Sequence, residues 1–341
     1  MDRKRVLTAL SGGVDSAAAA VLLQKAGYDC DGATLTLCGA EHTDDAEAVA
    51  ARLGMRFFVF DERERFGTAV LDDFVREYAA GRTPNPCVVC NHALKFGAFL
   101  ERALALGYDA IATGHYARID CVNGVYRLLR GADRRRDQSY FLYRLTQKQL
   151  SRLLLPVGGY DKTAIRELAR QAGLAAADRA DSQDICFLPD GDYVRFLTEN
   201  GVQLREGDFI DENGVVLGRH RGLPRYTVGQ GKGLGIALGK RVYVLAKDVA
   251  ANTVTLGDDA ALYRETLTAK AVNWIAGTPP ASVFRCCAKT RYSQTDAAAT
   301  VTLLGGGRIR VDFDTPQRAI TAGQAAVLYD GDAVLGGGTI E

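Results

Sequence analysis

The sequence predicts an α/β protein with a doubly wound parallel sheet, followed by a small β-rich domain and a C-terminal β-barrel. Three observations support this fold class. Strand-like and helix-like segments alternate from Arg5 to Thr113, the pattern of a parallel sheet with right-handed crossovers. A glycine-rich turn, Ser11-Gly12-Gly13, joins the first strand to the first helix. Past Gly201, Val, Thr and Tyr become frequent and hairpin turn signals appear.

The first part of the chain supplies the parallel sheet. Residues 5–10 are predicted as a buried strand and residues 16–26 as an Ala/Leu-rich helix that ends at Gly27. Further strands are predicted at 33–37, 57–60 and 110–113, and further helices at 44–53, 66–80 and 91–106. Such sheets bind ligands beyond the carboxyl ends of their strands, so we expect Ser11, Leu35 and Gly114 to lie together.

The rest of the chain is predicted to be helical first and β-rich afterwards. Helices are predicted at 147–153, 162–172 and 192–197. Asn213-Gly214 and Asp330-Gly331 are hairpin signals in the β-rich part. At about 100 to 200 residues per domain, 341 residues indicate two or three domains. We therefore predict domains at 1–200, 201–262 and 263–341.

The composition excludes several classes of protein. With 47% hydrophobic and 24% charged residues, the chain is neither disordered nor fibrous. No apolar run approaches the roughly 18 residues of a membrane helix, and the start leaves no room for the apolar stretch of a signal peptide. We therefore expect a cytoplasmic protein that does not span a membrane. Eight cysteines are too few for a disulfide scaffold.

Basic side chains are segregated along a chain of net charge +1. Residues 118–170 hold 12 basic and 5 acidic side chains, including the consecutive Arg134, Arg135 and Arg136. Residues 219–247 hold 7 basic side chains and no acid. A solvated face explains any single run, but two such stretches together indicate a localised phosphate-binding surface.

The string Ser11-Gly12-Gly13-Val14-Asp15-Ser16 lies between the first strand and the first helix. Glycines let the backbone approach an anion, and the N–H groups at the helix start point toward it. A kinase-type P-loop is excluded because Asp15, not Lys, precedes Ser16. A tight structural turn is the plainer alternative. The whole string resembles the pyrophosphate-binding loop of the ATP pyrophosphatase (PP-loop) superfamily, which implies adenylation with loss of pyrophosphate, Asp15 helping to hold Mg²⁺.

Three thiols are candidates for chemistry. Cys87 and Cys90 lie three positions apart in a proline-bounded loop, just before a predicted helix whose N-terminus would lower a thiol pKa. Cys186 follows about 95 residues later. A zinc site would need a fourth ligand, and only Cys286-Cys287 or His92 is available. The cysteines assigned to packing are Cys30, Cys38, Cys121, Cys286 and Cys287.

Over nearly its whole length the chain resembles the tRNA-specific 2-thiouridylase (MnmA/TrmU) family of that superfamily. The matching strings are LSGGVDS at 10–16, GRTPNP at 81–86, KF at 95–96, ATGHYA at 112–117, DQSYFL at 137–142, DSQ at 181–183, ICF at 185–187, GLGI at 233–236, DGD at 330–332 and LGGG at 335–338. The resemblance implies an ATP-dependent sulfurtransferase that converts the wobble uridine, U34, of tRNAs for Lys, Glu and Gln to 2-thiouridine. It also implies an adenine nucleotide α-hydrolase-like catalytic domain with a tRNA-binding helical part at 1–200.

The resemblance also assigns residues. It implies that Cys90 is the catalytic nucleophile and that Cys186 carries a persulfide supplied by a cysteine desulfurase or sulfur-relay protein. The implied ATP-binding residues are Ala9, Leu10, Ser11, Gly12, Gly13, Val14, Asp15, Ser16, Leu35 and Gly114. The implied tRNA-binding residues are His115, Asp137, Gln138, Ser139, Arg291, Tyr292 and Gln324. To these the charge pattern adds Arg134, Arg135 and Arg136 as phosphate contacts.

Two departures from the family pattern leave the sulfur route open. Cys87 stands where many members have Asp, so Cys87, Cys90 and Cys186 together could hold a [4Fe-4S] cluster whose fourth iron binds sulfide. That alternative replaces the persulfide route, in which a Cys90–Cys186 disulfide forms. The second departure is the short segment 38–43, which lacks the longer acidic-aromatic insertion usual in the family and so alters a possible sulfur-donor contact.

Two other functions are compatible with parts of the sequence. Another adenylating ligase of the superfamily would be expected to have a glutaminase domain or partner, and the chain encodes no such domain. A non-catalytic tRNA-binding iron–sulfur protein would leave the string at 11–16 without a purpose. Pyrophosphate release that depends on both ATP and tRNA would distinguish a thiolase from both alternatives.

Overall fold

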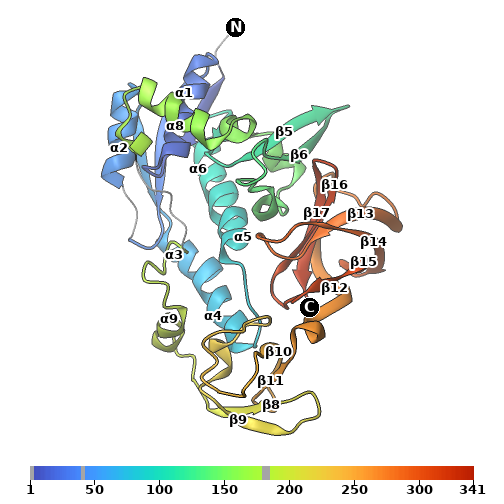
Figure 1. Cartoon of the computed structure of the whole chain (residues 1–341). Helices are drawn as coiled ribbons and strands as arrows, with labels where there is room; N and C mark the ends of the chain where they lie inside the picture. Colours follow the sequence, from blue (N-terminus) through green and yellow to red (C-terminus); the bar gives the residue numbers. More distant parts are fainter. Residues whose placement is uncertain (1–3, 40–42, 179–184) are drawn as a thin grey trace.

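The computed structural model describes residues 4–39, 43–178 and 185–341. The chain forms three sheets, and Figure 1 shows the α/β part, the small middle sheet and the C-terminal barrel in different regions of the molecule. The predicted α/β class is confirmed, as are the β-rich middle part and the closed barrel. Residues 40–42 of the shortened segment and residues 181–183 of the family-matching strings lie outside the described residues.

The first sheet is parallel throughout, with strand order β3-β2-β1-β4-β7. Its strands are β1 (Arg5–Ala9), β2 (Asp29–Thr36), β3 (Phe57–Asp61), β4 (Ala110–Ala112) and β7 (Leu153–Leu154). The sequence predicted a helix at 147–153, but the helix α7 (Gln147–Leu150) stops earlier, and Leu153 lies in β7 instead. A two-residue strand is too short to show a period, so its pairing with β4 was not predictable from the pattern.

Helices cover both faces of this sheet. On one face lie α1 (Val14–Lys25), α2 (Thr43–Arg52) and α8 (Lys162–Gln171). Ala17, Ala18, Ala19 and Ala20 of α1 are fully buried, because small side chains let the helix pack closely on the sheet and on α8. The other helical segments are α3 (Arg63–Phe66), α4 (Asp72–Ala79), α5 (Pro86–Cys90), α6 (Phe99–Ala105) and α9 (Tyr193–Glu199). π-Helical stretches at Gly67–Leu71 and Asn91–Ala98 join α3 to α4 and α5 to α6.

A β-hairpin in the first half of the chain was not predicted. It consists of β5 (Ala117–Val122) and β6 (Val125–Arg130), joined at Asn123 and Gly124, which have φ of 52° and 81°. An Asn-Gly pair with positive φ at both positions is a strong hairpin signal, so the sequence did contain the evidence. β6 pairs with β17 of the barrel, and the hairpin thus joins the two halves of the molecule (Figure 1).

The middle sheet has strand order β10-β11-β8-β9. Its strands are β8 (Gly207–Ile210), β9 (Val216–His220), β10 (Tyr243–Asp248) and β11 (Thr253–Gly257). Phe209, Val244 and Val254 form the centre of its own small core. Short 3₁₀ turns occur along the chain at Ser139–Leu142, Pro156–Gly159, Ala175–Asp178, Leu223–Arg225 and Asp259–Leu262.

The C-terminal sheet closes into a barrel because its first strand pairs with its last. The strands are β12 (Tyr263–Trp274), β13 (Val283–Lys289), β14 (Ala297–Gly305), β15 (Arg308–Arg318), β16 (Ala325–Asp330) and β17 (Ala333–Ile340). Val301, Val311 and Leu328 are fully buried inside it. In the part of the chain that the structure describes, no helix has both the length and the apolar character needed to cross a membrane.

Candidate active site

A cavity of about 370 Å³ opens at the carboxyl ends of β1 and β2. The glycine-rich loop contributes Ser11, and β2 contributes Leu35. The full lining is Ala9, Leu10, Ser11, Ala33, Thr34, Leu35, Leu37, Cys38, Phe66, Val70, Pro86, Cys87, Cys90, Lys95, Ile185, Cys186 and Phe187. The cavity therefore brings together the loop that was predicted to bind ATP and the three thiols that were predicted to carry sulfur.

The glycine-rich loop presents backbone donors at the start of α1. Gly12 has φ of 75°, a conformation that favours glycine, and α1 begins at Val14 without a side-chain cap. The Ser16 hydroxyl donates to the Gly13 carbonyl at 3.0 Å and accepts from the Ser11 N–H at 3.2 Å. These bonds hold the turn closed and leave the first N–H groups of α1 to bind an anion. The result is an anion site with the positive end of the α1 dipole behind it.

Gly114 packs directly under this loop. A Cβ atom there would lie 2.6 Å from the Ser16 nitrogen and from the Asp15 carbonyl carbon, so any side chain would displace the loop. The end of β4 thus supports the start of α1. Gly114 acts on the loop by close backbone approach, which explains why a glycine is required at this position.

Asp15 is held by two side chains from distant segments. Lys162, the first residue of α8, places Nζ 2.8 Å from both carboxylate oxygens, and the Tyr116 hydroxyl donates to Oδ1 at 2.6 Å. Neither partner was identified from the sequence. Asp15 has the right chemistry for Mg²⁺, but both of its oxygens are engaged by a cation here. The geometry therefore does not present Asp15 as a ready metal ligand.

Cys87 and Cys90 lie inside the first turn of a helix, not before it, because α5 begins at Pro86. Pro is favoured at this position because its missing N–H needs no partner. The sequence predicted a lowered thiol pKa, but burial raises the pKa of both thiols, with the Lys95 ammonium acting in the opposite direction. Desolvation outweighs the nearby positive charge, so both groups favour the neutral thiol.

Cys186 approaches the same cavity from the segment that follows residue 184. Burial raises the pKa of its thiol, Cys90 adds to the rise and Lys95 opposes it. Cys87 and Cys186 still expose part of their surface, whereas Cys90 is only 8% exposed. A fourth thiol, Cys38, lies beside them with Sγ 3.9 Å from the Cys186 carbonyl oxygen. None of the eight cysteines, all of which the structure describes, is in a disulfide.

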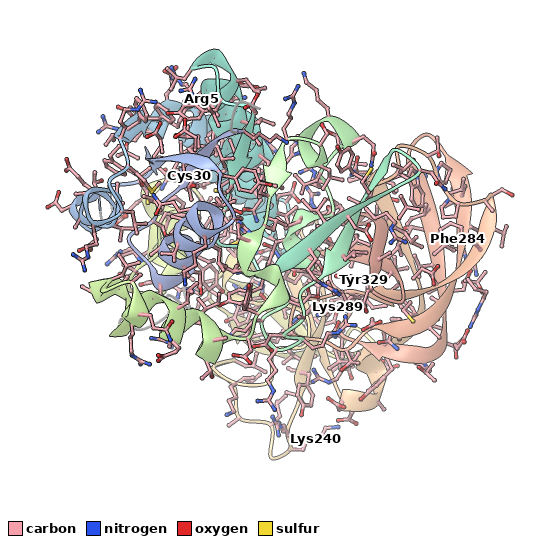
Figure 2. All side chains as sticks on the ribbon, turned by 90° about the horizontal axis from the view of Figure 1, so that it is seen from above. Arg5, Cys30, Lys240, Phe284, Lys289 and Tyr329 are labelled. Carbon is pink, nitrogen blue, oxygen red and sulfur yellow. The ribbon has the colours of Figure 1, made fainter. Side chains whose placement is uncertain are left out.

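The thiols of Cys87, Cys90 and Cys186 are candidate ligands for a metal cluster. Three thiols around one cavity are chemically suitable donors for an iron–sulfur cluster. Within residues 4–39, 43–178 and 185–341, however, no group of three or more His, Cys, Asp or Glu side chains is arranged to hold a metal ion. The donor types fit a cluster, and their spacing in this structure does not. Cys30, by contrast, lies in the core, where burial raises its pKa to about 12 (Figure 2).

Four residues that were predicted to contact tRNA have internal partners. Asp137 is 4% exposed and accepts from the Gly131 and Ser139 N–H groups, and Ser139 is fully buried. The Gln138 side-chain oxygen accepts from the Tyr116 N–H at 2.9 Å. His115 Nδ1 lies 2.8 Å from the Thr113 hydroxyl, and burial, helped by Lys95, holds the His115 pKa well below its usual range. These side chains shape the loop that follows β6 and the end of β4.

Two more of the predicted tRNA contacts join segments of the chain. Gln324 donates to the Thr83 carbonyl at 2.8 Å, so the barrel holds the loop that leads to Cys87. Arg291 donates to the Val228 carbonyl at 2.9 Å and to the Thr321 hydroxyl at 2.5 Å. It therefore ties the middle part of the chain to the barrel.

Tyr292 and the three consecutive arginines are placed differently. A groove of about 710 Å³ is lined by Arg134 and Arg135 on one side and by Lys289 and Tyr292 on the other. Tyr292 is 36% exposed and packs on Phe141 with ring centroids 4.5 Å apart. A second cavity, lined by Arg134–Arg136 and Lys162, adjoins the other side of the arginine loop. Cations and an exposed aromatic ring thus lead from the barrel toward the ATP loop.

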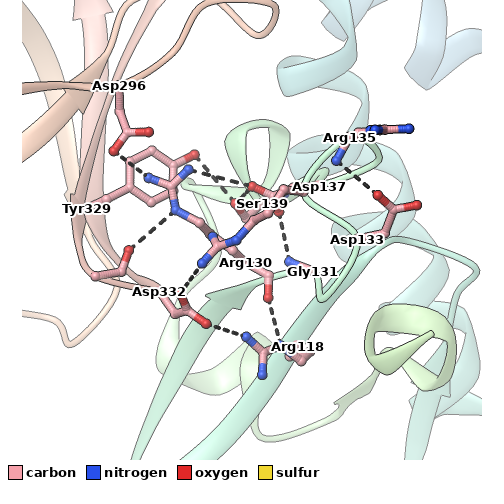
Figure 3. Close-up of polar contacts among 12 residues, drawn as sticks. Arg118, Arg130, Gly131, Asp133, Arg135, Asp137, Ser139, Asp296, Tyr329 and Asp332 are labelled. Carbon is pink, nitrogen blue, oxygen red and sulfur yellow. Dashed lines mark hydrogen bonds and ion pairs between the residues drawn. The ribbon is translucent and has the colours of Figure 1, made fainter. Parts of the chain in front are cut away.

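The floor of the groove is a buried network around Arg130, which is 7% exposed (Figure 3). Its guanidinium carbon lies 3.6 Å from the centre of the Tyr329 ring, and it pairs with Asp296 at 2.9 Å and with Asp137 at 4.0 Å. These charges compensate one another, whereas Arg134, Arg135 and Arg136 of the adjoining loop are exposed. Arg134 does pair with Asp332, so part of its charge is compensated.

The second basic stretch, 219–247, is less cationic than its sequence indicated. Arg219 pairs with Asp208 and Lys240 with Asp258, both acids from outside the stretch. Lys247 donates to the Tyr226 carbonyl, and burial lowers its pKa to about 8. Lys240 also lies at an outer edge of the molecule, well away from Lys289 (Figure 2). The four other cations of the stretch are exposed, namely Arg221, Arg225, Lys232 and Arg241, so both basic stretches keep cations at the surface.

Three family models match the chain in succession. The tRNA methyl transferase HUP domain matches residues 4–190, the tRNA methyl transferase PRC-barrel domain matches 195–258, and the aminomethyltransferase beta-barrel domain matches 264–340. These correspond to the three sheets described above.

Curated relatives match over nearly the full length. A tRNA-specific 2-thiouridylase MnmA of Roseiflexus castenholzii is 47% identical, covering 98% of this chain and 99% of its own. The enzymes of the same name from Carboxydothermus hydrogenoformans and Heliobacterium modesticaldum are 46% and 48% identical, covering 99% of this chain and 98% and 92% of their own. Among solved structures, a 4-thiouridine synthetase in complex with RNA and ATP is 18% identical, covering 57% of this chain and 50% of its own with a TM-score of 0.38.

Proposed function

The chain belongs to the tRNA-specific 2-thiouridylase family, and we propose that it converts the wobble uridine, U34, of tRNAs for Lys, Glu and Gln to 2-thiouridine. The family identifies the chain as an enzyme, a tRNA sulfurtransferase that uses ATP. One observation carries the proposal: Ser11 of the ATP loop and the thiols of Cys90 and Cys186 line a single cavity. Activation of the base and delivery of sulfur can therefore take place at one point.

ATP activates the uridine by adenylation of O2. The N–H groups at the start of α1 bind the departing pyrophosphate, and their charge stabilisation needs no rearrangement at the moment of reaction. Lys162 lies beside Asp15 at the same helix end, where it adds positive charge toward the phosphates. Mg²⁺ commonly reaches such sites on the nucleotide phosphates, and no step here is assigned to it.

Sulfur then moves through two thiols. The outer sulfur of a Cys186 persulfide attacks C2 of the adenylated uridine, and AMP leaves. The Cys90 thiolate next attacks Cys186 Sγ, which breaks the persulfide S–S bond and leaves sulfur on the base. A Cys90–Cys186 disulfide is formed, and two electrons from an external thiol are needed to reset it. Cys186 suits contact with a sulfur donor because it is exposed, and Cys90 suits resolution because it is buried beside it.

The tRNA would reach this cavity across the groove beside Arg134, Arg135 and Arg136. The cations bind backbone phosphates, and Tyr292 offers a face on which an unpaired loop base can stack. An anticodon-loop base is already unpaired, so turning it toward the thiols costs little. The buried Asp137 and Ser139 would then act by shaping the loop, and Gln138, His115, Arg291 and Gln324 through the internal contacts described above.

An iron–sulfur route is the second candidate. It is favoured by the presence of three thiols, Cys87, Cys90 and Cys186, around one cavity. A cluster there would supply an open iron able to bind sulfide. Iron and acid-labile sulfide measured on protein purified without oxygen, with Cys87→Ser alongside, decides between the routes. About four irons per chain that are lost in the variant would replace the persulfide scheme, whereas an iron-free protein that thiolates tRNA would support it.

The main test measures pyrophosphate release and 2-thiouridine on the same tRNA. With a persulfide donor, both should require ATP and tRNA. Cys90→Ser and Cys186→Ser should retain tRNA-dependent pyrophosphate release but lose 2-thiouridine, whereas Cys121→Ser, an exposed thiol on β5, should behave as wild type. Pyrophosphate release that needs no tRNA would instead favour another adenylating ligase. A U34→C34 tRNA should give no product.

We assign residues 1–200 to the catalytic domain, 201–262 to the central domain and 263–341 to the barrel. A cysteine desulfurase or sulfur-relay protein supplies the persulfide, and pull-down with Cys186→Ser as control tests this. The cytoplasmic location stays a prediction from the sequence.

A further inference from the structure

Cys38 lies at the active cavity although nothing in the chemistry described above uses it. It lies two residues past the end of β2, and its side chain lines the same cavity as Cys87, Cys90 and Cys186. Its Sγ atom is 3.9 Å from the Cys186 carbonyl oxygen, so the Cys38 thiol contacts the backbone of Cys186. The sequence had assigned Cys38 to packing. The structure instead places four thiols around one cavity, Cys38 among them.

We propose that Cys38 is the thiol that opens the Cys90–Cys186 disulfide after each turnover. This inference rests on the persulfide route proposed above. The Cys38 thiolate attacks Cys186 Sγ, the Cys38–Cys186 disulfide forms, and the Cys90–Cys186 bond breaks with its electron pair on Cys90. One disulfide replaces another, so this step needs no oxidant or reductant.

The position of the leaving group favours this direction of attack. Attack at Cys186 expels Cys90, and the ammonium group of Lys95 lies where it stabilises a Cys90 thiolate. Cys90 is only 8% exposed and Cys38 is half-buried, so the exchange joins the exposed Cys186 to a more accessible thiol than Cys90. An external dithiol then reduces the Cys38–Cys186 disulfide, taking its two electrons and returning both thiols.

Cys87 is the competing candidate. It lies three positions before Cys90 on α5, so it could attack Cys90 and give a Cys87–Cys90 disulfide with Cys186 as the leaving thiolate. The two routes leave different pairs of cysteines joined. Mapping the disulfide after one turnover therefore distinguishes them.

The test uses the full chain loaded with persulfide, ATP and tRNA, quenched with acid, alkylated and mapped by mass spectrometry. After one turnover, wild type should contain mainly the Cys38–Cys186 disulfide, and both Cys38→Ser and Cys38→Ala should accumulate Cys90–Cys186. With a limiting dithiol, the steady-state rate of 2-thiouridine formation by these variants should be about tenfold lower than the rate of their first turnover. The reason is that reduction of the Cys90–Cys186 disulfide becomes the slow step. Cys121→Ser, which removes an exposed thiol far from the cavity, should match wild type in both measurements.

Two results would overturn the inference while leaving the sulfur route in place: a Cys90–Cys186 disulfide in wild type at the level found in Cys38→Ser, or a Cys87–Cys90 disulfide in both. A different result would count against the route itself. If wild type forms 2-thiouridine with no disulfide that includes Cys186, both the persulfide scheme and the role of Cys38 are wrong. The first-turnover yield of each variant shows that it is folded and binds its substrates.

Discussion

Lys162 at the start of α8 places its ammonium group 2.8 Å from both carboxylate oxygens of Asp15 in the ATP loop. The two residues are 147 positions apart in the sequence. The Lys162 side chain is only 12% exposed. In this ion pair, the Asp15 carboxylate compensates the positive charge of Lys162 beside the N-terminus of α1. When polyphosphate binds, the same cation lies beside the incoming negative charge.

The first prediction concerns this pair. Lys162→Met should lower the rate of tRNA-dependent pyrophosphate release by about 10²-fold, since a positioned charge at the departing group is worth that much in other enzymes. Lys148→Met, which removes an exposed cation on α7, is the matched control. Rapid-quench assays with labelled ATP measure both. An unchanged rate in Lys162→Met would show that the lysine only balances Asp15.

The second prediction concerns pH. Burial raises the pKa of the Cys90 thiol above its ordinary value, so the thiolate that attacks Cys186 is a minor form at neutral pH. The rate of sulfur transfer in a single turnover should therefore increase with pH from 7 to 9. Because Lys95 lowers the pKa of the Cys90 and Cys186 thiols, Lys95→Gln should raise each pKa and move the profile to higher pH, whereas Lys95→Arg should keep it in place. Alkylation rates of each thiol against pH give an independent measurement, and superimposable profiles for all three proteins would contradict the role of Lys95.

The sequence predicted the parallel sheet because local alternation of strands and helices determines it. It did not reveal Lys162 and Tyr116 as partners of Asp15, because no pattern links residues more than 100 positions apart. The same limit hid Cys38, which is 148 positions from Cys186. Thiol acidity was predicted from the helix N-terminus alone, and the opposite shift in pKa arises from burial, which only the packed structure reveals. The hairpin at β5 and β6 is different, because Asn123-Gly124 was a usable signal in the sequence.

The third prediction concerns the arginine loop. Replacing Arg134, Arg135 and Arg136 together by Glu should weaken tRNA binding and flatten its salt dependence, lowering the slope of log K against log salt by about 2. Arg134 is expected to contribute less than the other two, because Asp332 already compensates part of its charge. Replacing Arg264 on β12 together with Arg308 and Arg310 on β15 by Glu changes the net charge by the same amount and is the control. Measuring the tRNA binding constant of both variants at several salt concentrations gives the two slopes of log K against log salt. Equal slopes would exclude the arginine loop from the tRNA interface.

The fourth prediction concerns stacking on Tyr292. Tyr292→Ala should weaken tRNA binding by about 1–2 kcal/mol if a loop base stacks on its exposed face, and Tyr292→Phe should retain most of the affinity. Tyr263→Ala removes a similarly exposed ring on β12 and should have no effect. Fluorescence anisotropy with a labelled anticodon stem-loop measures all three. If Tyr292→Ala and Tyr263→Ala bind equally well, the base does not stack there.

The fifth prediction separates two roles for Gln324. Its side-chain amide donates to the carbonyls of Thr83 and Pro84, at 2.8 and 3.3 Å, so it fixes the loop that leads into the first turn of α5. Gln324→Ala should therefore lower the free energy of unfolding by about 1–2 kcal/mol and reduce 2-thiouridine formation, while tRNA affinity changes little. Gln317→Ala is the control, because that amide bonds only to Thr315 nearby in sequence. If Gln324→Ala instead retains stability and loses tRNA affinity, the side chain contacts tRNA directly and its bonds to the loop are secondary.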